Sequence, residues 1–88
     1  MKILIVDDER QLTDALTAIL KQNKYSVDCA YNGIDGLDQA LSGIYDLIIL
    51  DVMMPKIDGI SLLKTLRAKK FDTPVLLLSA KSEQTCVL

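Results

Sequence analysis

ILIVDD, residues 3–8, is a run of four aliphatic residues that ends in two aspartates. A continuous aliphatic run, with no polar residue at every second position, is typical of a strand buried on both faces, as in a parallel sheet. A second run of this kind, LIIL at residues 47–50, is followed by Asp51. The sequence therefore predicts two buried parallel strands, over residues 2–6 and 46–50, each followed by carboxylates.

Helical and strand patterns alternate along the rest of the chain. Apolar residues recur at helical spacing over residues 9–23, again over residues 34–41, and once more after Asp58-Gly59. Two further strands are expected at residues 25–30 and 74–78. Such alternation builds a parallel sheet through right-handed crossovers. We expect an α/β fold, a doubly wound flavodoxin-like parallel sheet with strand order 2-1-3-4.

The residues after Leu78 show no pattern of a fifth strand or of further helices. The segment 79–88 is polar until Thr85 and has no sustained period. We therefore expect an incomplete domain over residues 1–83, with an atypical tail at residues 84–88. The fourth strand would then be an apolar sheet edge, which favours a homodimer or swapped oligomer through that strand.

Composition limits the function of this segment. The 88 residues suffice for one domain, and the net charge of -2 disfavours direct binding to nucleic acids or anionic membranes. The two cysteines, Cys29 and Cys86, lie far apart in a chain without histidine, so neither a zinc site nor a disulfide framework is indicated. No apolar run is long enough for a membrane span. These features favour a cytoplasmic domain.

Three aspartates are expected to converge at one edge of the sheet. Asp7 and Asp8 follow the first strand and Asp51 follows the third, and these strands are neighbours in the predicted order. Like charges so close cost stability unless a cation lies among them, and carboxylate oxygens suit Mg²⁺. Beside Mg²⁺, the carboxylate of Asp51 could attack phosphorus. Ser79, after the fourth strand, could contact the transferred phosphoryl group.

Simpler interpretations of the same residues remain open. Asp7 or Asp8 could cap the following helix, because carboxylates accept hydrogen bonds from free backbone N–H groups. Ser79 could be an ordinary loop hydroxyl. A phosphatase with an aspartyl-phosphate intermediate is disfavoured, because Met53 stands where such enzymes usually carry a second aspartate.

Three segments together resemble the receiver domain of two-component response regulators, of the type joined to a winged-helix transcriptional regulator. They are ILIVDDE at residues 3–9, LDVMMPKIDG at residues 50–59 and PVLLLSA at residues 74–80. The resemblance implies a phosphoacceptor rather than an enzyme, which takes a phosphoryl group from a histidine kinase and controls an effector in transcription.

The resemblance also implies a role for each matching residue. Asp51 would accept the phosphoryl group, Asp8 and Asp51 would ligate Mg²⁺ directly, and Asp7 would do so through water. The backbone oxygen of Met53 would be a further ligand, and Ser79 the switch hydroxyl. Receiver domains also carry a lysine at the end of a fifth strand and a last helix, which these 88 residues lack. The alternative is therefore a truncated fragment that cannot signal and self-associates through its open edge.

Overall fold

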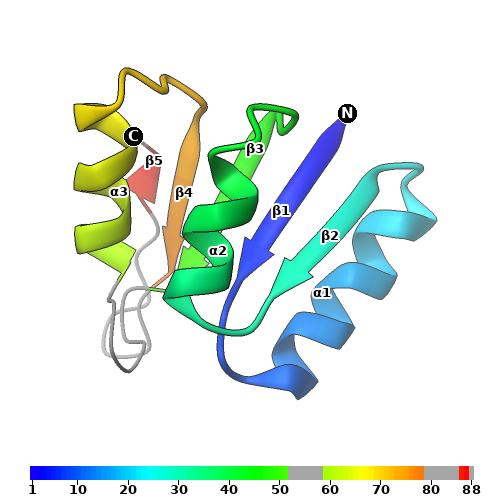
Figure 1. Cartoon of the computed structure of the whole chain (residues 1–88). Coiled ribbons are helices and arrows are strands. Elements are labelled where there is room, and N and C mark those ends of the chain that lie inside the picture. Colours follow the sequence, from blue (N-terminus) through cyan, green and yellow to red (C-terminus); the bar gives the residue numbers. More distant parts are fainter. Residues whose placement is uncertain (52–58, 79–85, 88) are drawn as a thin grey trace.

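The computed structural model describes residues 1–51, 59–78 and 86–87. In this part of the chain, strands and helices alternate up to β4 (Figure 1). The elements are β1 (Lys2–Val6), α1 (Arg10–Gln22), β2 (Ser26–Ala30), α2 (Gly33–Ala40), β3 (Leu47–Asp51), α3 (Gly59–Ala68), β4 (Val75–Leu78) and β5 (Cys86–Val87). The sheet order is β2-β1-β3-β4-β5, with parallel pairing between the first four strands. The predicted fold class and the order 2-1-3-4 are confirmed.

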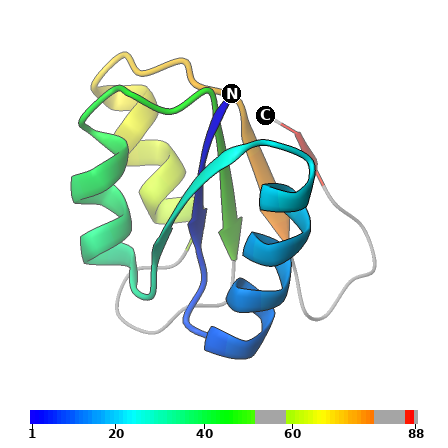
Figure 2. The same ribbon diagram turned by 90° about the vertical axis from the view of Figure 1, so that its right-hand side faces the viewer.

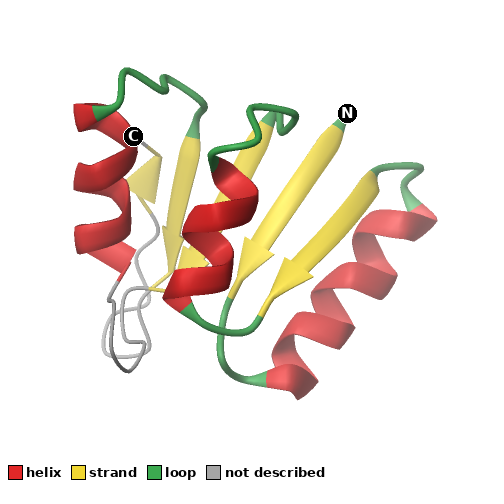
Figure 3. Ribbon diagram, viewed as in Figure 1, coloured by secondary structure: helices red, strands yellow, loops and turns green. Residues whose placement is uncertain are grey.

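Helices cover both faces of the sheet, which explains the continuous aliphatic runs of the central strands. Helix α1 lies on one face, and α2 and α3 lie on the other (Figures 2 and 3). Side chains of a strand alternate between the faces. Leu4 and Leu50 therefore join the core beneath α2 and α3, whereas Ile3, Ile5 and Ile49 pack with residues of α1. A strand that contacts a helix layer on each side needs an apolar residue at every position.

Gly36 allows α2 to approach β1 closely. A Cβ atom at this position would lie 2.6 Å and 2.8 Å from the two γ-carbons of Val6, which is fully buried. Neither the helix nor the central strand can move apart without opening the core, because protein interiors are close-packed. The glycine is therefore required by packing.

Gly36→Ala is expected to lower the free energy of unfolding by about 1–3 kcal/mol, the usual cost of overpacking. The clash outweighs the gain in helix propensity, which is about 1 kcal/mol. Urea denaturation measures the change. The control is Asp38→Ala, an exposed substitution in the same helix, which should stay within about 0.5 kcal/mol. A more stable Gly36→Ala variant would contradict the packing argument.

The expectation that no fifth strand follows β4 is wrong in part. Residues 86–87 form β5, which pairs antiparallel with β4 through Leu76↔Val87 and Leu77↔Cys86. This strand could not be predicted, because two residues are too few to show a periodic pattern. The outer edge of β4 is thus covered over two residues, whereas the sequence predicted an open edge. Self-association through β4 stays a prediction.

Within the described ranges, none of the helices has both the length and the apolar character needed to cross a membrane.

Candidate functional site

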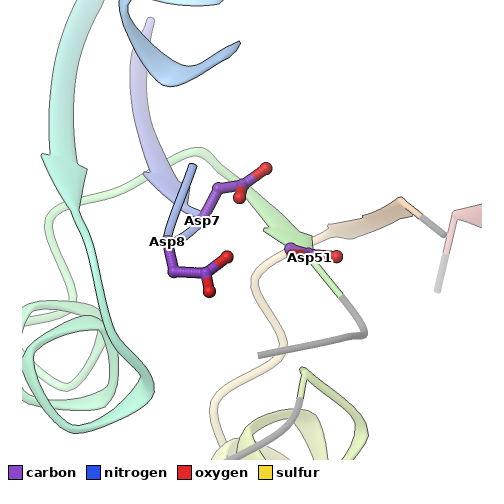
Figure 4. Close-up of side chains that lie close together, drawn as sticks. All are labelled: Asp7, Asp8 and Asp51. Carbon is purple, nitrogen blue, oxygen red and sulfur yellow. The ribbon is translucent and has the colours of Figure 1, made fainter. Parts of the chain in front are cut away.

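The register of the sheet brings the predicted acidic residues together. Val6 of β1 pairs with Leu50 of β3, so Asp7 and Asp51 leave neighbouring strands at the same level. One carboxylate oxygen from each of Asp7, Asp8 and Asp51 lies within 4.8 Å of the others (Figure 4). The predicted convergence of the three aspartates is confirmed. We call these three residues the acid cluster.

The members of the acid cluster differ in burial. Asp7 is 3% exposed, Asp51 is partly exposed and Asp8 is exposed to solvent. Asp7 Oδ1 accepts a hydrogen bond of 2.9 Å from the backbone N–H of Glu9, the N-cap residue of α1, whose own side chain makes no capping bond. Asp7 therefore fixes the turn into α1 and also belongs to the acid cluster. The hydrogen bond supports the predicted structural role of Asp7 at the start of α1, and its role as a metal ligand stays a prediction.

Burial and like charges disfavour the ionised form of Asp7. Burial is the largest cause that raises the pKa of Asp7 above its ordinary value of 3.8, and the hydrogen bond from the Glu9 N–H opposes it. The negative charges of Asp51, Asp8 and Glu9 raise this pKa further. The ionised carboxylate is therefore held in the folded chain at a cost in free energy.

This cost determines the direction in which stability changes with pH. Asp7 keeps its proton to a higher pH in the folded than in the unfolded chain, so stability falls as pH rises from 3.8 through the folded value. Asp7→Asn is therefore expected to raise the free energy of unfolding at pH 7 in metal-free buffer, by on the order of 1 kcal/mol. The amide oxygen can still accept the bond from Glu9.

Urea denaturation at pH 7 and at pH 3 tests this expectation. The gain should disappear at pH 3, where the wild-type carboxyl group is protonated in both states. Asp38→Asn removes an exposed carboxylate elsewhere and should show little change at either pH. A loss of stability in Asp7→Asn at pH 7 would refute the assigned repulsion.

The donor set of the acid cluster fits a hard divalent cation. Three carboxylates supply oxygen atoms alone, which Mg²⁺, Ca²⁺ and Mn²⁺ prefer over nitrogen or sulfur ligands. A cation among them would offset the repulsion that raises the pKa of Asp7. Two further predicted site residues, Met53 and Ser79, lie outside the described residues.

Two residues at this edge were not singled out from the sequence. Tyr31 directly follows β2, and its ring centroid lies 4.0 Å from Cζ of Arg10, the first residue of α1. The position of Tyr31 after a strand was a usable signal, because all carboxyl ends of parallel strands meet at one edge. The contact itself depends on side-chain conformation.

The family model of the response regulator receiver domain matches residues 3–88. The chain belongs to this family. The predicted resemblance is therefore confirmed. A transcriptional regulatory protein, DltR of Streptococcus agalactiae, is 46% identical over 83 residues, which make up 94% of this chain and 37% of DltR. The chain thus spans little more than a third of that relative.

Solved structures of receiver proteins share the fold. The response regulator TrrA of Thermotoga maritima, in complex with Mg²⁺-BeF, is 42% identical over 90% of this chain and 69% of TrrA, with a TM-score of 0.84. TrrA in complex with the histidine kinase ThkA gives 41% identity over 93% of this chain and 71% of that chain, with a TM-score of 0.85. Receiver domains of response regulators are not classical enzymes, and they pair with sensor histidine kinases.

Proposed function

We propose that this chain is the phosphoacceptor module of a two-component phosphorelay, in which Asp51 accepts a phosphoryl group from a histidine kinase. The observation that carries the proposal is the acid cluster, where the Asp51 carboxylate meets those of Asp7 and Asp8 within 4.8 Å. The family match and the two TrrA complexes, one with Mg²⁺-BeF and one with a histidine kinase, support it.

The acid cluster would hold Mg²⁺ through oxygen ligands. Asp8 and Asp51 are the proposed direct ligands, Asp7 a ligand through water, and the backbone oxygen of Met53 a further ligand. When bound, Mg²⁺ supplies positive charge that neutralises the phosphoryl oxygens. The exposed Asp8 and partly exposed Asp51 are accessible from solvent, whereas the buried Asp7 anchors the turn beneath them.

Asp51 supplies the nucleophile of the transfer. One of its carboxylate oxygens attacks phosphorus, a new O–P bond forms, and the N–P bond to the kinase histidine breaks. The electron pair of that bond stays on the imidazole nitrogen. With a small donor such as acetyl phosphate, the bond from phosphorus to the acetate oxygen breaks instead. Each transfer leaves an aspartyl phosphate, so the chain is the acceptor and at most catalyses its own phosphorylation and dephosphorylation.

Ser79 is the proposed reporter of the modification. Its hydroxyl would contact a phosphoryl oxygen on Asp51 and shift the population of two conformations, which a cytoplasmic effector would read. By the resemblance to DltR, that effector acts in transcription. The division into a receiver unit at residues 1–83 and a tail at residues 84–88 also stays a prediction.

Intact-mass measurement after incubation with acetyl phosphate tests the proposal. The wild-type chain should gain the mass of one phosphoryl group with Mg²⁺ and none when EDTA removes the metal. A chain that gains no mass with Mg²⁺, or an equal mass with EDTA, would reject the proposed chemistry.

A second candidate function is self-association through β4. The observation that favours it is the short β5, which pairs with two of the four residues of β4. Unpaired backbone groups at a sheet edge recruit other strands. Light scattering at micromolar concentration should then show dimers or larger species, and a stable monomer would contradict this candidate.

A further inference from the structure

Arg10 and Tyr31 lie at the same edge of the sheet as the acid cluster. Val6 of β1 pairs with Ala30 of β2, so Tyr31 and Asp7 leave neighbouring strands at the same level. The sheet order β2-β1-β3 puts Tyr31 on one side of Asp7 and Asp51 on the other. Arg10, two residues after Asp8, lies with its guanidinium carbon 4.0 Å from the centroid of the Tyr31 ring.

Arg10 occupies a position that helix electrostatics disfavours. It is the first residue of α1, where the helix dipole repels positive charge and favours acidic side chains. The first turn of α1 contains no acidic residue, and the side chain of the N-cap, Glu9, makes no capping bond. Side chains that break a local rule next to a functional site are candidates for a role in that site.

Arg10 contacts the ring of Tyr31, and no ion pair between Arg10 and the acid cluster is found among the described residues. A guanidinium so close in sequence to Asp8 would be drawn to its carboxylate, but the ring face of Tyr31 offers an alternative partner. Among the described residues, the ion pair found is that of Lys2 with Asp28, and Arg10 contacts the ring instead. Its hydrogen-bond donors are thus held at the edge of the site and remain available to an anion.

We infer that Arg10 is a positioning residue for the phosphodonor. Its guanidinium attracts the anionic phosphoryl group, and Tyr31 holds Arg10 in place. This role rests on the proposed function of Asp51. A phosphoryl dianion is repelled by the carboxylates it must approach, and a guanidinium is the side chain best suited to bind it, because its planar donors match phosphate oxygens. The exposed charge of Arg10 offsets part of the repulsion between the phosphoryl group and the carboxylates before transfer.

The test is Arg10→Gln, which removes the charge and should have two effects of opposite sign. The half-saturating concentration of acetyl phosphate should rise roughly fivefold, the upper end for one exposed charge pair, with an unchanged rate at saturation. Mg²⁺ should bind more tightly, because a repelling cation is gone. General damage to the site would weaken the binding of acetyl phosphate and of Mg²⁺ alike. Opposite changes in the two affinities therefore indicate a loss of the Arg10 charge rather than general damage. Arg10→Lys should restore most of the donor effect.

Tyr31→Leu tests the holding role separately. Without the ring, Arg10 is expected to pair with Asp8 and compete with Mg²⁺, so metal affinity should fall. The double variant, with both Arg10→Gln and Tyr31→Leu, should have the Mg²⁺ affinity of Arg10→Gln, since the competing positive charge is then absent. Lys21→Gln, which removes a cation from the far end of α1, is the matched control and should change neither property.

Two measurements separate the possible failures. Initial rates come from intact mass, and Mg²⁺ affinity comes from isothermal titration calorimetry, which needs no phosphorylation. A wild-type chain that takes up no phosphoryl group overturns the proposed function and this inference together. Normal uptake in the wild type, with the same donor dependence or weaker Mg²⁺ binding in Arg10→Gln, overturns the role of Arg10 alone.

Discussion

Asp51→Asn is expected to abolish phosphoryl uptake, lowering the rate with acetyl phosphate and Mg²⁺ by at least about a thousandfold, as is usual when a nucleophile is removed. The amide has nearly the same shape as the carboxylate but is a poor nucleophile and carries no charge. Asp51 also contributes an oxygen to the acid cluster, so metal affinity should fall as well. Intact mass measures uptake, and calorimetry measures Mg²⁺ binding.

The control for Asp51→Asn is Asp38→Asn, which removes an exposed carboxylate of α2 and should leave uptake unchanged. Circular dichroism of both variants should match the wild type. An equal gain of mass in Asp51→Asn would show that another residue accepts the phosphoryl group, and the proposed function would then be wrong.

Leu50→Ala is expected to lower the free energy of unfolding by about 3–5 kcal/mol, the range for a buried leucine that leaves a cavity. Leu50 is 0% exposed, lies in β3 and pairs with residues of both flanking strands, Val6 and Leu77. Total stabilities of small domains are about 5–15 kcal/mol, so this one substitution removes a large share. The unfolding midpoint in urea should fall accordingly.

Leu12→Ala is the matched control, because it makes the same chemical change on α1 where the side chain is 41% exposed. Its cost should be well under that of Leu50→Ala, since less apolar surface leaves water on folding. Similar losses for both variants would mean that the described core is not the main source of stability.

Much of the fold could be predicted because each element carries its own periodic signal. The aliphatic runs of β1 and β3 reflect helices on both sides of the sheet, and the helical spacing in α1 follows from burial of one face. The two-residue β5 could not be predicted, because its pairing with β4 comes from tertiary contact rather than local pattern.

The hydrogen bond of Tyr45 could not be predicted from the sequence either. Its hydroxyl donates a hydrogen bond of 2.7 Å to Asp28 Oδ2, seventeen residues earlier in the chain. Burial, together with this bond and the charge of Asp28, raises the pKa of Tyr45 to about 12. Nothing in either local segment indicates the partner, since the fold alone brings the loop between α2 and β3 close to β2.

The acid cluster was predictable for a topological reason, namely that parallel strands end at one edge. The unequal burial of Asp7 and Asp8 was not, because adjacent residues leaving a strand can turn either way. The contact between Arg10 and Tyr31 likewise depends on rotamers that no spacing rule specifies.

The pairing of Val6 with Leu50 means that the convergence of the acid cluster depends on the number of residues in β1 and β3. Because successive side chains of a strand project to opposite sides, inserting or deleting one residue within β1 or β3 would turn its terminal aspartate away from its neighbours. The proposed phosphoryl transfer therefore constrains the number of residues in β1 and β3 more strictly than it constrains which aliphatic residues occupy them.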